Sequence, residues 1–189
     1  MAQLTFIPVR EEEALALRNG KDIASRVACA ATESLVAAIE TDPSEPGSVE
    51  EEAEFAALSY AGVLGLFQGS GPVRLVLAAD VQSSQVKSDD HNPYGVLDVS
   101  KLRWSQVRAL FTDEADAGPA VLKAREAIAE AGGAWTLDEA LALPAVEELM
   151  HDYDLLWYAP AELDQLVSAP EQADGEADRA DERPVTEVS

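Results

Sequence analysis

Short apolar segments of strand length alternate with helix-like segments along most of the chain, and this order limits the folds open to it. The strand patterns lie at residues 4–8, 25–32, 74–81, 95–100, 107–113 and 155–158, and the clearest helical patterns at residues 11–18, 48–69, 119–130 and 137–150. The order predicts an α+β domain with a mixed sheet of about five or six strands packed with helices in two layers. An α/β domain is the alternative.

Two capping boxes mark the starts of helices. Ser48 with Glu51, and Thr136 with Glu139, have the S/T-x-x-E spacing in which side chain and backbone bond each other reciprocally. In the first of these helices Phe55, Leu58, Gly62 and Leu66 recur at helical spacing. We interpret Gly62 and Gly65 as points of close packing on this helix.

The composition changes at the C-terminal end of the chain. Residues 169–189 contain seven acids, two arginines and almost nothing to bury, so we expect a disordered acidic tail after a single domain of residues 1–168. The whole chain has 36 acidic and 13 basic residues and a formal net charge of -23. Without the tail's -5 (2 - 7), the domain still carries -18. The acidity is therefore a property of the domain as well.

This charge limits the partners. A strongly negative field repels nucleic acid phosphates and anionic membrane surfaces, so we expect no direct nucleic acid and no membrane binding. A basic protein partner fits the sign better, and a homodimer is open. Cys29, the one cysteine, lies in an apolar run and is expected to be a small buried hydrophobe. With no possible internal disulfide and no apolar run of about 18 residues, we expect a soluble cytoplasmic protein.

The sequence patterns of catalysis are missing. The glycines of residues 62–71 fit neither the P-loop nor the dinucleotide-binding spacing, and they follow a helix rather than a strand. No serine has a G-x-S-x-G context, and the chain has two histidines, His91 and His151. We therefore predict no catalytic residue, cofactor or metal, and we lean away from an enzyme.

Four residues are nevertheless candidates for a site. Asp80 and Asp113 end strand patterns, and if those strands are parallel, both carboxylates lie at the edge where ligands gather in α/β sheets. The competing interpretation is that each aspartate caps the following turn. His151 precedes the last strand, and Tyr158 ends it with a hydroxyl that needs a partner or water.

Two clusters in the sequence combine a histidine with acids. Asp89 and Asp90 precede His91, and Asp152 and Asp154 follow His151. If the fold brings the clusters together, they offer nitrogen and oxygen ligands suited to zinc, manganese or iron. Their spacing matches no ligand signature, and acids in turns commonly bond their own backbone.

The segment YDLLWYAPAELDQL, residues 153–166, raises the question of an aromatic binding surface. Leu155 and Trp157 alternate with Leu156 and Tyr158, so both faces of the strand are apolar. Such a strand is usually covered on both faces, which predicts a closing core strand with Trp157 buried. A largely exposed Trp157 would instead favour binding.

Three segments carry a resemblance to a known family: RLVLAADV, VRALFTDEAD and YDLLWYAPAEL. With their LAADV and LLWYA-x-x-EL motifs, they resemble a family of small acidic actinobacterial proteins without an assigned function, over most of residues 4–166. The resemblance implies no activity, cofactor or functional residue. Two functions stay open: a non-catalytic interaction or regulatory module that docks a basic protein, and a small enzyme or ligand-binding domain with carboxylates at strand ends.

Overall fold

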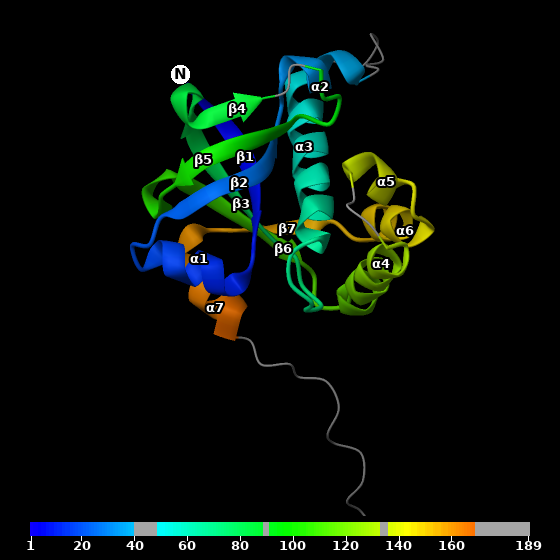
Figure 1. Ribbon diagram of the computed structural model, residues 1–189. Coiled ribbons are helices and arrows are strands. Elements are labelled where there is room, and N and C mark those ends of the chain that lie inside the picture. The colour runs from blue at the N-terminus through cyan, green and yellow to red at the C-terminus, as the bar shows by residue number, and fades with distance from the viewer. Residues whose placement is uncertain (40–48, 89–90, 133–135, 169–189) are drawn as a thin grey trace, which may run out of the picture.

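A computed structural model describes residues 1–39, 49–88, 91–132 and 136–168 (Figure 1). The strands are β1 (Ala2–Val9), β2 (Ile23–Ala30), β3 (Leu75–Gln82), β4 (Val86–Ser88), β5 (Val96–Leu102), β6 (Val107–Asp113) and β7 (Leu155–Tyr158). The helices are α1 (Glu11–Arg18), α2 (Glu33–Ala38), α3 (Val49–Leu66), α4 (Gly118–Glu130), α5 (Leu137–Leu141), α6 (Pro144–Asp152) and α7 (Leu163–Ser168). The predicted α+β class is confirmed. The predicted tail lies outside the described residues, as does Ser48.

The strands form one sheet, in the order β4-β5-β2-β1-β3-β6-β7. Every pairing between the described strands is antiparallel, whereas we expected a mixed sheet, and the sheet has seven strands rather than five or six. The helices do not return the chain to a parallel neighbour, which rules out the α/β alternative. The strand β4, in the segment expected to be a loop, accounts for the additional strand.

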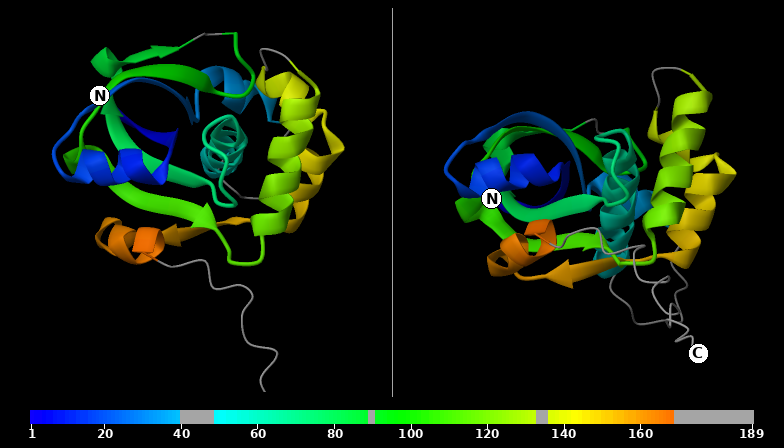
Figure 2. Two further views of the ribbon diagram at one scale, coloured as in Figure 1. Left: turned by 60° about the horizontal axis from the view of Figure 1, so that its bottom comes forward. Right: turned by 90° about the horizontal axis from the view of Figure 1, so that it is seen from below.

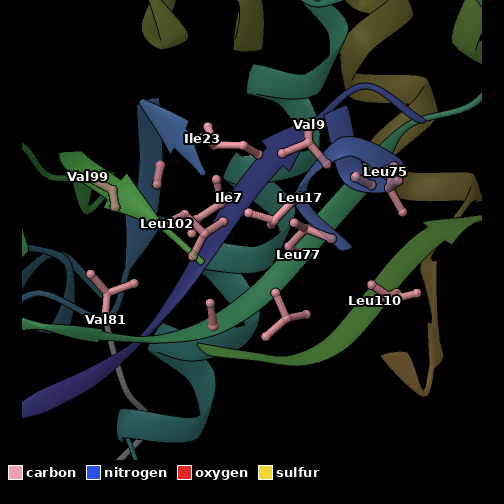
Figure 3. Close-up of a cluster of buried hydrophobic side chains, with 14 of the residues drawn as sticks. Ile7, Val9, Leu17, Ile23, Leu75, Leu77, Val81, Val99, Leu102 and Leu110 are labelled. Carbon is pink, nitrogen blue, oxygen red and sulfur yellow. The ribbon is translucent and has the colours of Figure 1, made fainter. Parts of the chain in front are cut away.

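Alternation along the strands separates the side chains of the sheet into two sets. Ile7 and Val9 of β1 share one face with Leu75 and Leu77 of β3, where α1 adds Leu17 (Figure 3). Leu163 of α7 belongs to the same cluster. A period of two residues along each strand produces this division.

The opposite face is covered by α2 and α3. Phe6 and Cys29 from the sheet pack there with Leu35 of α2 and Leu58 of α3. The predicted burial of Cys29 is confirmed, and burial raises the pKa of its thiol to about 12. The helices α4, α5 and α6 pack against the other side of α3 as a further layer, so the expected two layers are exceeded (Figure 2).

Local sequence signals position several of these helices. Thr136 accepts a hydrogen bond from the backbone N–H of Glu139, whose carboxylate accepts one from the backbone N–H of Thr136, so this capping box is confirmed. Pro144 occupies the first turn of α6, where its missing N–H leaves no bond unmade. No helix in the described part of the chain is long and apolar enough to cross a membrane.

Candidate functional site

The two candidate aspartates lie at opposite ends of two adjacent strands. Because β3 and β6 are antiparallel, the carboxyl ends of these strands point in opposite directions. The backbone N–H of Arg74, at the start of β3, donates to Asp113, and Asp80 lies six residues further along, roughly 20 Å away. The condition under which they were expected to meet, parallel strands, is therefore not fulfilled.

Asp113 is bound to Arg74 in the interior of the protein. The Nε of Arg74 donates to Oδ1 and Oδ2 of Asp113 at 3.0 and 3.1 Å, and Nη2 donates to Oδ1 at 2.5 Å. The two side chains are 3% and 0% exposed. With both carboxylate oxygens accepting hydrogen bonds, Asp113 joins the start of β3 to the end of β6. The pair acts as a clamp between two strands.

Asp80 forms an ion pair at the surface. Its Oδ2 accepts a hydrogen bond from Nε of Arg108 on the neighbouring β6, at 2.6 Å. The backbone oxygen of Asp80 accepts another hydrogen bond, from the side chain of Gln106. These contacts connect the C-terminal end of β3 to the N-terminal end of β6.

The remaining candidates lie elsewhere. His151 is exposed in the last turn of α6, and Tyr158 of β7 packs against the core beneath α1 and α7. The structure therefore does not gather Asp80, Asp113, His151 and Tyr158 into one site. Asp89 and Asp90 lie outside the described residues, and among those described no cluster of three or more histidine, cysteine or acidic side chains could hold a metal ion.

The prediction that Trp157 is buried is wrong, because β7 is an edge strand rather than a central strand of the sheet. It pairs with β6 on one side, and the described residues place no strand on the other. Trp157 is 61% exposed and Leu156 41% exposed. The alternation of the strand was interpreted correctly, since Leu155 and Trp157 share one face. The prediction that both faces of the strand are covered was wrong, because that depends on the order of the strands in the sheet.

Trp157 lines a groove between α3 and the β6–β7 end of the sheet. The larger of two hollows has a volume of about 370 Å³ and is lined by Phe55 and Leu58 of α3 and by Phe111 and Trp157 of the sheet. The smaller hollow also contacts Phe55 and Leu58, and it extends to Arg74, Met150 and Asp154. Phe55 and Leu58 line both, so the smaller hollow, of about 30 Å³, adjoins the larger one, and the two together are here called the aromatic groove.

The floor of the aromatic groove is apolar and fixed by packing. Leu4 and Phe6 of β1 and Ala78 of β3 contribute to it. The rings of Phe6 and Phe111 meet edge to face, with their centroids 6.2 Å apart. These packed side chains form an apolar surface on which a ligand could lie.

Gly62 of α3 packs closely against Leu155 and Arg74, two residues that line the aromatic groove. A Cβ on Gly62 would lie 3.0 Å from Cδ1 of Leu155 and 3.4 Å from Nη1 of Arg74, so the close packing expected of this glycine is confirmed. Phe55 lies seven residues earlier, about two turns along the same stripe of the helix. At that point of the helix Phe55 is 62% exposed.

The rim of the aromatic groove is negatively charged. Glu51 and Glu54 of α3 line the larger hollow, and Asp154, just before β7, lines the smaller one. The two cations that also line the groove already have carboxylate partners: Arg74 is paired with Asp113 and Arg108 with Asp80. The groove therefore combines an apolar floor with a net negative rim.

Phe55 and Trp157 were not predicted as site residues. Apart from the terminal Met1, they are the most exposed large apolar side chains in the described part of the chain. The aromatic content of residues 153–158 was the available signal for Trp157. Phe55 had no comparable signal, because its helical spacing is also that of a buried residue.

Comparison with known proteins identifies a family without an assigned activity. A family model described as "Family of unknown function (DUF6912)" matches residues 4–167. The predicted membership of an uncharacterised family is confirmed, while the actinobacterial origin, the acidity and the motifs of that family stay predictions. No curated protein and no solved structure matches the chain.

Proposed function

The chain belongs to the family of unknown function DUF6912, and we propose that it is a non-catalytic protein-interaction module that docks a basic protein. The observation that carries the proposal is the pair Phe55 and Trp157, two large aromatic side chains more than 60% exposed on opposite sides of one groove. Contiguous exposed apolar surface with a polar rim is typical of docking sites.

The energetics of binding favour this surface over the rest of the molecule. Tryptophan and other aromatic side chains supply much of the affinity at protein interfaces, because covering them removes a large apolar area from water. A negative rim adds attraction for a basic partner and speeds its encounter with the groove. A second copy of this chain, with the same net charge of -23, would be repelled over most of its surface. A basic partner is thus the better occupant.

Capture from a cell lysate at low and moderate salt tests the proposal. We expect one or more basic proteins to bind the wild-type chain and to be released as salt screens the charges. Phe55→Ala and Trp157→Ala should lose the same proteins, because each removes an exposed ring from the groove.

Leu122→Ala is the matched control. Leu122 is a large apolar residue of α4 that is 45% exposed and lies outside the aromatic groove. It should retain every partner. The proposed function is wrong if no captured protein is both released by moderate salt and lost from Phe55→Ala and Trp157→Ala.

A further inference from the structure

The aromatic groove has acids at both ends and aromatic residues between them. Glu51 and Glu54 line the larger hollow, Asp154 lines the smaller one, and Phe55 belongs to both. Along α3 the lining residues run from Glu51 to Ser59, a rise of roughly 12 Å. This length suits a short peptide segment rather than a single side chain.

The two ends do not carry equal charge. At the end formed by the larger hollow, Glu54 is exposed, and Arg108, which lines the same hollow, is paired with Asp80 at 2.6 Å. At the other end Asp154 is exposed, whereas Arg74 is buried and its guanidinium is bound by Asp113. The cations of the lining are therefore neutralised by carboxylates outside the groove. Each end presents net negative charge, and the middle is apolar.

We propose that the groove recognises a peptide segment in which large apolar side chains are flanked on both sides by lysine or arginine. The apolar side chains pack between Phe55 and Trp157, and the flanking cations lie beside Glu54 at one end and Asp154 at the other. The inference rests on the proposed function and specifies the segment of the basic partner that binds. It makes the order of charges, and not only their number, the basis of recognition.

Synthetic peptides of equal composition separate order from charge. The flanked probe is acetyl-Lys-Lys-Phe-Leu-Phe-Lys-Lys-amide, and the one-ended probe places all its lysines before Phe-Leu-Phe. Two further probes replace the lysines by glutamate, or the apolar residues by serine. Isothermal titration with the full chain should show the flanked probe binding about three- to tenfold more tightly than the one-ended probe. The glutamate and serine probes should bind at least about tenfold more weakly than the flanked probe.

Variants of the two ends then locate each cation. Asp154→Asn and Glu54→Gln should each abolish most of the preference for the flanked probe, because each removes the carboxylate at one end of the groove. Glu130→Gln, which changes an exposed acid at the end of α4, is the control for total charge and should keep the preference. Trp157→Ala should weaken both lysine probes by about tenfold.

The results distinguish this inference from the proposed function. Equal binding of the flanked and one-ended probes, or a preference that survives both Asp154→Asn and Glu54→Gln, overturns the inference. So does a failure of the lysine probes to bind better than the serine probe. In each of these cases the proposed function stands if lysate partners still depend on Phe55 and Trp157. Loss of that dependence overturns the proposed function itself.

Discussion

Two pairs of side chains along the same helix–sheet boundary reverse the usual division between core and surface. Arg74 and Asp113 are charged and almost completely buried, whereas Phe55 and Trp157 are apolar and more than 60% exposed. Gly62 of α3 packs closely against Arg74 and against Leu155 of β7. The charged pair is hydrogen-bonded within the protein, and the aromatic pair lines the groove. The first is explained by stability alone, and the second points to a partner.

Asp113→Ala is the change with the largest expected effect on stability. It leaves the buried guanidinium of Arg74 without its carboxylate, which costs about 3–5 kcal/mol when one partner of a buried pair is removed. Urea unfolding would measure the free energy of unfolding. Asp80→Ala breaks an exposed pair and should cost below about 1 kcal/mol. Equal losses in the two variants would contradict the structural role given to Asp113.

Gly62→Leu tests the point at which α3 and β7 touch. The added side chain must displace Leu155 and press on Arg74, and overpacking of this kind costs about 1–3 kcal/mol. Thermal unfolding would report the loss. Gly71→Leu is a matched control, since a Cβ there meets nothing within 4 Å. A neutral Gly62→Leu would mean that the helix is not held against β7.

Glu13 provides an ion pair intermediate between the buried and the exposed ones. Burial alone would raise the pKa of its carboxyl, but hydrogen bonds from Arg10 and Arg26 lower it overall. A lowered folded-state pKa stabilises the protein above the unfolded value of about 4.3, and the gain is lost as the pH falls through the folded-state pKa.

Glu13→Gln should therefore cost about 1 kcal/mol at pH 7. The difference from wild type should vanish in acid, as unfolding curves across pH would show. A difference that stays constant down to acidic pH would mean that the charge of Glu13 contributes nothing to stability.

Trp157→Ala should change stability least. An exposed side chain on a terminal strand loses little packing when truncated, so we expect a change of below about 1 kcal/mol. Leu110→Ala, in the adjacent strand but fully buried, should cost about 2–5 kcal/mol. Comparable losses in urea unfolding would show that Trp157 serves the core, as the sequence pattern had suggested.

Local patterns were sufficient to predict the α+β class and most of the elements. The strand at residues 107–113 and the cap at Thr136 need only information from neighbouring residues. Strand order does not follow from such patterns, because β7 joins β6 only after α4, α5 and α6 have intervened. The sequence therefore could not say that β7 would be terminal and Trp157 exposed.

The candidate site was missed for the same physical reason. Asp80 and Asp113 were grouped on the assumption of parallel strands, and the antiparallel register separates them. That register instead brings Arg74 to Asp113, whereas the place of β7 at the end of the strand order leaves Trp157 exposed at the aromatic groove. Long-range pairing decided both outcomes, and no local pattern records it.

The most direct test of the docking proposal observes the three tryptophan indole groups in one NMR titration. Their N–H signals, assigned with Trp157→Phe and Trp104→Phe, would be followed as the flanked lysine peptide is added. The docking account predicts a saturating shift of the Trp157 signal, with little change at Trp104, which packs against the core on the other face of the sheet. A Trp157 signal that stays fixed while the peptide binds would place the interaction elsewhere and contradict the account.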